Sequence, residues 1–183
     1  MGKLFLLLIS KHQFGFWCIC LILIGLRFVH FGNEVDAPHD WRQCDTANYI
    51  YDFHQDGIDL FHPTVCWMGG HGEVILEFPL PEAISAILYN CFGPDLRLAR
   101  LVTVFFTLLS AVYLYALLLL FTTEKFAQTA VSVFLLLPLG LYYSRAVHID
   151  FCVLGMAHGM VYHLARAFRD RSDRLGRSRN QIT

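Results

Sequence analysis

The chain contains four long apolar runs, which are separated by polar segments. The runs lie at 14–31, 98–121, 126–143 and 151–168. Each is close to the roughly 20 residues that an α-helix needs to cross the hydrocarbon core of a membrane. The pattern predicts an all-α integral membrane protein with about four transmembrane helices, in which Arg27 and His30 reach the headgroups from the end of the first helix.

A fifth apolar stretch, at 78–92, is shorter and has a different character. It carries two prolines and Glu82, which favour a helix that lies along the membrane surface over one that spans it. The segment before it, at 32–77, holds nine carboxylates against a single basic residue, Arg42. This segment is predicted to be an aqueous loop between the first two spans.

Charged residues set the orientation of the spans. The C-terminal stretch from Arg166 holds six arginines against two aspartates, and Lys3 and Lys11 precede the body of the first apolar run. By the positive-inside rule both ends face the cytoplasm, so the number of spans is even. We therefore predict an uncleaved start, a membrane domain at 1–168 and a basic cytoplasmic tail at 169–183.

The composition also favours a membrane protein, and the distribution of ionisable residues disfavours a transport function. Hydrophobic residues make up 56% of the chain and charged residues 16%, below the quarter that is usual in soluble domains. A transporter would carry ionisable groups inside its spans, whereas the mid-span regions offer only His158 and His163, which are expected to pack or hydrogen-bond. Gly155, Ala157 and Gly159 predict the close approach of a neighbouring helix.

The polar loop contains residue types that bind zinc or form disulfides. Among them are His39, His62, His71, Cys44 and Cys66. Neither a C-x₂-C nor an H-x₃₋₅-H spacing is present, so a structural zinc site is not expected. Cys44 and Cys66 could pair if the loop faces an oxidising compartment, an alternative that their spacing does not decide.

One motif in the loop resembles a known family. The segment HDWRQCDTA at 39–47, followed by Tyr49, Ile50 and Phe53, resembles the H-x-W-R-Q-x-D-T-A segment of bacterial family-39-like glycosyltransferases. These enzymes are relatives of the protein O-mannosyltransferases and of aminoarabinose transferase. The resemblance continues, in the same order, through GIDLFHP at 57–63, GE at 72–73, EFPL at 77–80 and SRAVHID at 144–150.

The resemblance implies the N-terminal part of a GT-C membrane fold and a transferase activity. Such enzymes move a sugar from a polyprenyl-phosphate carrier to a lipid or protein acceptor on the non-cytoplasmic face, here that of a bacterial inner membrane. The expected partners are the lipid-linked donor, the acceptor and the membrane, with no nucleic acid. Members are much longer, so the match covers nearly this whole chain but only the beginning of such an enzyme, as in a truncated product, a fragment or one piece of a split enzyme.

Sugar transfer requires a base for the acceptor hydroxyl and cationic or hydrogen-bonding groups for the departing phosphate. Asp40, Asp45 and Glu77 are the candidates for the base. The W-R-Q-x-D form of the motif favours Asp45, although the register of the catalytic acid in better-known relatives could also fall on Asp40. Arg42 and Arg145 are the candidates for binding the phosphate.

The last matching motif supplies supporting residues, and two alternatives accompany the catalytic hypothesis. His148 and Asp150 are predicted to support the site. A divalent cation, Mg²⁺ or Mn²⁺, could bridge Asp45 or Glu77 to the donor phosphate. Alternatively, the chain is a catalytically incomplete four-helix membrane protein that binds a lipid or a partner through its acidic loop, in which case these acids cap helices or are merely solvated.

Overall fold

The protein is helical along most of the residues that the computed structural model describes. These residues are 11–29, 31–32, 34–35, 40–68, 72–74 and 76–179, with side chains placed between residues 14 and 171. The helices are α2 (Lys11–Gly25), the 3-10 helix η1 (Leu26–Phe28), α3 (Asp40–Asp56), the 3-10 helix η2 (Cys66–Met68), α4 (Leu80–Phe92), α5 (Leu96–Leu118), α6 (Glu124–Leu136), α7 (Pro138–Tyr143) and α8 (Asp150–Arg179). Over these residues, extended backbone pairs in a single isolated bridge, between Thr64 and Glu73. The prediction of an all-α fold is confirmed.

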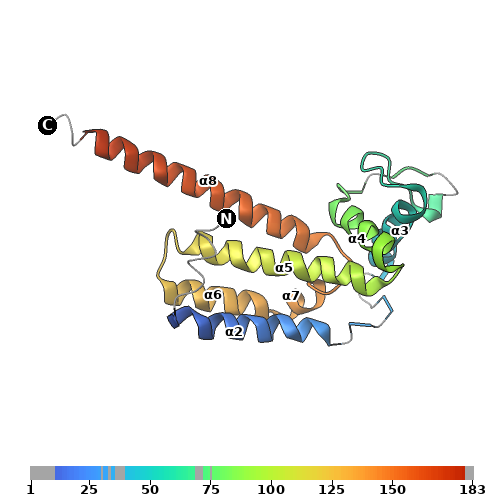
Figure 1. Cartoon of the computed structure of the whole chain (residues 1–183), viewed down its shortest axis with the longest axis horizontal. Helices are drawn as coiled ribbons and strands as arrows, with labels where there is room; N and C mark the ends of the chain where they lie inside the picture. The colour runs from blue at the N-terminus through green and yellow to red at the C-terminus, as the bar shows by residue number, and fades with distance from the viewer. Residues whose placement is uncertain are drawn as a thin grey trace.

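The helices form a bundle with a smaller pair of helices at one end (Figure 1). In the bundle, α2, α5 and α6 lie side by side, and α8 packs along α5 before its C-terminal part extends beyond the other helices. The head, which we define as residues 40–92 with α3 and α4, lies where α2 finishes and where α5 and α8 begin. The polar segment predicted at 32–77 therefore includes a helix, α3.

α5 is the described helix whose length and composition suit a membrane crossing. It has 23 residues, and Asp95 caps its first turn by accepting a hydrogen bond from the backbone N–H of Arg97 at 2.8 Å. The apolar helical stretch Phe14–Phe28 is shorter than such a crossing usually requires. Among the described helices, length and composition thus give one candidate span, whereas the apolar runs predict four.

The apolar run at 126–143 forms two helices instead of the single one predicted. α6 ends at Leu136 and α7 begins at Pro138, with Leu137 between them at φ −54° and ψ 126°. Proline has no N–H to continue the hydrogen bonds of α6, and its ring disfavours helical backbone at the preceding residue. The break leaves carbonyl groups in the last turn of α6 without helical donors.

Arg27 supplies a donor to one of these carbonyl groups. Its guanidinium donates to the Leu135 carbonyl oxygen at 3.0 Å and to the Leu23 carbonyl oxygen at 2.6 Å, and the residue is fully buried. The prediction that Arg27 reaches the headgroups is therefore wrong, because the break in α6 holds this charge inside the bundle. His30, predicted to act with it, lies outside the described residues.

Two glycines allow α8 to lie against α5. A Cβ atom at Gly155 would lie 3.0 Å from the carbonyl oxygen of Phe106, and one at Gly159 would lie 3.1 Å from the ring of Tyr113. The predicted close approach of a neighbouring helix is confirmed at these two glycines. Ala157 instead lines a groove on the surface of α8.

His158 and His163, predicted to lie at the middle of a span, also belong to the contact between α5 and α8. His158 Nδ1 lies 2.9 Å from a serine hydroxyl of α5, and His163 Nε2 lies 3.5 Å from the hydroxyl of Tyr113. Both therefore hydrogen-bond between helices. α8 then continues to Arg179, so the basic tail predicted at 169–183 is a helical extension of α8 as far as that residue.

An apolar cluster joins the head to the bundle. α3 contributes Ile50 and Phe53, α4 contributes Ala86 and Tyr89, and the cluster includes Val147 beside the start of α8. The apolar positions recur every three or four residues, so each of the two helices has one buried face. Burial of these faces turns α3 and α4 toward the start of α8, and it brings the polar residues beside those faces to the same place.

Candidate functional site

Gln43 joins the head to the segment that precedes α8 through hydrogen bonds. Its side chain is buried, and Oε1 accepts a hydrogen bond from the backbone N–H of Val147 at 3.2 Å while Nε2 donates to the Tyr142 hydroxyl at 3.1 Å. Buried amides require such partners, because an unmet donor or acceptor inside a protein is costly. The structure thus brings the motif at 39–47 into contact with the motif at 144–150.

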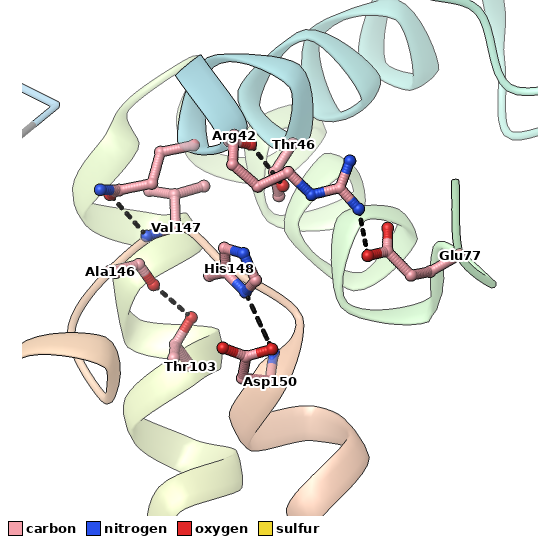
Figure 2. Close-up of polar contacts among 9 residues, drawn as sticks. Arg42, Thr46, Glu77, Thr103, Ala146, Val147, His148 and Asp150 are labelled. Carbon is pink, nitrogen blue, oxygen red and sulfur yellow. Dashed lines mark hydrogen bonds and ion pairs between the residues drawn. The ribbon is translucent and has the colours of Figure 1, made fainter. Parts of the chain in front are cut away.

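Arg42 and Glu77 form an ion pair at the edge of the head (Figure 2). Arg42 Nη2 donates to Glu77 Oε1, and the two side chains are 15% and 37% exposed. One turn further along α3, the hydroxyl of Thr46 donates to the carbonyl oxygen of Arg42 at 3.1 Å. The pair is therefore partly shielded on the Arg42 side and open to an incoming molecule on the Glu77 side.

Asp45 lies on the same side of α3 as Arg42. It is 9% exposed, and its Oδ1 accepts a hydrogen bond from Trp67 Nε1 at 3.0 Å. One turn on, Tyr49 is buried, which raises its pKa, and the charges of Arg42, Glu77 and Asp45 all act on its hydroxyl. Helical spacing thus places Arg42 and Asp45 on the same side of α3 as Tyr49. The ion pair with Arg42 brings Glu77 to them from the segment before α4.

Asp40 occupies a different position. It is the first residue of α3 and is exposed, and its Oδ1 accepts a hydrogen bond from the backbone N–H of Trp41 at 2.9 Å. A carboxylate there stabilises the start of the helix through free N–H groups and the helix dipole. Of the two alternatives for the base, Asp45 is the one that lies near the Arg42–Glu77 pair.

His148 and Asp150, the predicted supporting residues, are bonded to each other. His148 Nδ1 lies 3.2 Å from Asp150 Oδ1, and the two side chains are 13% and 56% exposed. Figure 2 shows the pair beside Thr103 of α5, with Arg42 and Thr46 on the other side of His148. Asp150 belongs to the first turn of α8, where an acidic side chain suits the helix dipole.

Arg145 turns toward the bundle. Its guanidinium donates to the carbonyl oxygen of Val29, which follows η1 at the end of the first apolar run. This bond ties the segment before α8 to the segment after α2. Of the two predicted phosphate ligands, Arg42 is the one that the structure places beside Glu77.

Glu82 is a buried carboxyl that the sequence did not single out as a site residue. It lies in the first turn of α4 and is 3% exposed, and its Oε2 has no hydrogen-bond partner among the described residues. Burial raises the pKa of Glu82 to about 7. A signal was present in the sequence, since Glu82 precedes Ala86 by four residues and Tyr89 by seven and so shares their buried face.

An apolar groove opens beside the ion pair, between the segment that precedes α4 and the side of α8. Its lining includes Glu77, Phe78, Leu80, Val153, Met156 and Met160. Several of these apolar side chains are about half exposed or more. A molecule with a charged head and an apolar chain would meet Arg42 and Glu77 at its head and α8 along its chain.

The carboxylates predicted as ligands of a divalent cation have other partners. Asp45 bonds to Trp67, and Glu77 bonds to Arg42. Across the part of the chain that the structure describes, no three His, Cys, Asp or Glu side chains gather as ligands for one ion. His39 and His71, considered for zinc, lie outside that part.

Other polar residues of the predicted loop bond to one another within the loop. His62 Nδ1 lies 2.9 Å from Asp59 Oδ2, and both side chains are exposed. Cys44 and Cys66 are free, exposed thiols, so the disulfide that their spacing left open is not formed. Asp52, which no motif singled out, accepts hydrogen bonds from two side chains of the loop.

No protein-family model, curated protein or solved structure matches this chain. The chain's own side chains remain: Arg42, Asp45 and Glu77 act on the hydroxyl of Tyr49, and the apolar groove begins at Glu77.

Proposed function

We propose that this chain is a membrane glycosyltransferase, or the N-terminal part of one, that transfers a sugar from a polyprenyl-phosphate carrier to a lipid or protein acceptor. The observation that carries the proposal is the junction of the Arg42–Glu77 ion pair with the apolar groove on α8. Such a junction fits a substrate with an anionic head and a long apolar chain. The resemblance of the motifs at 39–47 and 144–150 to family-39-like enzymes points to the same substrate class.

In the proposed chemistry Asp45 and Arg42 act on the reacting groups, and Glu77 positions Arg42. The acceptor oxygen forms a bond to the anomeric carbon of the sugar while the bond from that carbon to the phosphate oxygen breaks. The phosphate leaves with the electron pair, and the acceptor proton passes to the Asp45 carboxylate. Arg42 stabilises the departing phosphate, because Glu77 engages Nη2 and the guanidinium has further N–H groups.

We place the head on the non-cytoplasmic side of a bacterial inner membrane. In this arrangement α2, α5, α6 with α7, and α8 cross the membrane, and the arginine-rich end of α8 lies in the cytoplasm. Crossing by α6 and α7 includes the break at Pro138, which spanning helices tolerate when neighbouring groups satisfy the freed backbone. Arg27 supplies such a group at the Leu135 carbonyl oxygen.

The proposal is tested by profiling glycolipids and glycoproteins of a deletion strain complemented with the natural gene or with Asp45→Asn or Glu77→Gln. We expect the natural protein to restore a missing sugar and each variant to lower its transfer, by roughly 10²- to 10⁴-fold for Asp45→Asn. Asp56→Asn is the matched control, because Asp56 is an exposed acid at the far end of the same helix. Immunoblots of membrane fractions verify equal amounts of each protein.

Two results would refute the catalytic hypothesis. One is that the deletion removes no sugar from any lipid or protein. The other is that the double variant Asp45→Asn, Glu77→Gln complements as well as the natural protein. Either result would favour the alternative of a four-helix membrane protein that binds a lipid or partner through its acidic head.

A further inference from the structure

A second polar site lies inside the head, behind the ion pair. A small cavity there is bordered by α3, α4, α5 and the segment before α8, and it has room for about one water molecule. Its polar lining comes from Thr46, Glu82, Ser85, Thr103 and His148. The proposed transfer chemistry uses none of these side chains.

The three hydroxyl groups of this lining have already donated their protons. Thr46 donates to the Arg42 carbonyl oxygen at 3.1 Å, Ser85 to the Pro81 carbonyl oxygen at 2.7 Å, and Thr103 to the Ala146 carbonyl oxygen at 2.9 Å. Figure 2 shows the bonds of the two threonines. A hydroxyl has one proton, so each of these oxygens can only accept from, or coordinate, whatever enters the cavity.

Glu82 adds a carboxyl group to this set of acceptors. It is 3% exposed, it lines the cavity, and its Oε2 has no partner among the described residues. Its position in the first turn of α4 places it near free backbone N–H groups and the positive end of the helix dipole, which favour the ionised form. A buried carboxylate still requires a counter-charge close to it.

The neighbouring charged groups offset the charge of Glu82 only in part. Arg42 acts on Glu82 from α3, but it is bonded to Glu77, which acts from the segment before α4 with the opposite sign. His148 faces the cavity from the segment before α8 and is bonded to Asp150. The Cys152 thiol approaches from α8, and α5 contributes no titratable side chain to the cavity lining.

We propose that the cavity binds one Na⁺ ion through the Glu82 carboxylate and the hydroxyl oxygens of Thr46, Ser85 and Thr103, and that a proton on Glu82 replaces the ion. Hard cations prefer such oxygen ligands. A single carboxylate balances a single positive charge, which favours a monovalent over a divalent ion. The small size of the cavity favours Na⁺ over larger monovalent cations. The inference does not depend on the transferase proposal.

The test is thermal unfolding of the purified full chain in detergent, in NaCl, KCl or N-methylglucamine chloride at equal ionic strength. At about pH 8.5, where Glu82 is ionised, we expect NaCl to raise the melting temperature by roughly 5 °C over N-methylglucamine chloride, in a saturable manner. At about pH 5.5, where Glu82 is protonated, the difference should vanish. KCl should give a smaller rise than NaCl.

Variants distinguish this site from a general effect of salt. Glu82→Gln should abolish the response to Na⁺, whereas Asp56→Asn should retain it because Asp56 is exposed at the far end of α3. Ser85→Ala, which keeps the carboxylate and removes one ligand, should raise the Na⁺ concentration for half the effect roughly tenfold, and it serves if Glu82→Gln does not fold. Two results would overturn the proposal. One is that the natural protein melts at the same temperature in NaCl and in N-methylglucamine chloride at the higher pH, which would mean that water alone fills the cavity. The other is an undiminished Na⁺ response in either cavity variant.

Discussion

The bundle and the head use charged side chains in opposite ways. In the bundle, Arg27 donates to backbone carbonyl groups of α2 and α6, and Arg100 of α5 donates to the carbonyl oxygens of Phe31 at 2.5 Å and Glu34 at 2.9 Å. In the head, the guanidinium of Arg42 bonds to another side chain, that of Glu77. Glu82, also in the head, keeps a carboxyl oxygen without a partner among the described residues.

The difference separates structural from chemical roles. A backbone carbonyl group stays in place whatever is bound, so an arginine attached to it fixes the fold. A carboxylate at the end of a side chain can change its partner or its proton without moving a helix. Substitutions in the bundle should therefore change stability, and substitutions in the head should change the response to pH, to ions or to substrate.

The largest expected effect on stability comes from Glu82→Gln in the absence of Na⁺. The pKa of Glu82 is raised to about 7 in the folded protein. At pH values between the ordinary carboxyl pKa and about 7, the folded state therefore binds more protons than the unfolded state. Stability of the natural protein should therefore fall as the pH rises through this window, by on the order of 3 kcal/mol, and then level off. Unfolding at a series of pH values in N-methylglucamine buffers measures the fall, which Glu82→Gln should remove. The same pH dependence in the natural protein and in the variant would show that the Glu82 carboxyl group is exposed to solvent.

Arg27→Leu is the corresponding test in the bundle. The variant leaves the Leu135 carbonyl oxygen at the α6 break without its donor, and loss of a buried hydrogen bond to a charged group costs about 2–3 kcal/mol. The loss should be the same at all pH values and should leave the Na⁺ response intact. Denaturant titration in detergent measures it. A variant as stable as the natural protein would show that the bundle does not need this donor.

The sequence predicted the helices better than it predicted their partners. The length and apolar character of a run are local properties, and they placed helical segments over most of the apolar runs. These local properties could not show that Pro138 divides one run. The free energy that a proline costs a helix depends on which groups bond to the carbonyl oxygens that it leaves without donors. Arg27 satisfies one of them from a helix more than a hundred residues earlier in the chain, and such a contact has no local signature.

The candidate site, too, depends on contacts between distant segments. The motif placed Arg42, Asp45 and Glu77 on a short list, and the structure gathers them around Tyr49. The motif favoured Asp45 but left Asp40 open as the base, since only the turn of α3 puts Asp45 inside and Asp40 at the start of the helix. Glu82 was overlooked because its carboxyl was assigned to the polar side of a surface helix, whereas the cavity is made by four segments at once.

Gln43→Leu tests the connection between the two regions. The substitution leaves the backbone N–H of Val147 and the hydroxyl of Tyr142 without the amide, and a buried donor left unmet costs about 1–3 kcal/mol. Because Gln43 holds the head on the segment before α8, the proposed transfer activity and the proposed Na⁺ response should both decline with stability. Hydrogen exchange at residues 144–150 should increase more than exchange within α5. Faster exchange confined to α5 would show that Gln43 does not hold this connection.

The smallest expected effect compares Gly155→Ala with Gly159→Ala inside the bundle. Alanine raises helix propensity by about 1 kcal/mol at either position, so the difference between the variants reports the neighbouring helix. At position 155 the new Cβ meets the backbone of Phe106 at 3.0 Å, which can yield only if α5 and α8 separate. At position 159 it meets the ring of Tyr113 at 3.1 Å, and a side chain can rotate. We therefore expect Gly155→Ala to be less stable than Gly159→Ala by about 1–2 kcal/mol in denaturant titrations. Equal stabilities would show that α8 can shift along its whole length, in which case the groove beside Glu77 would not be a fixed surface.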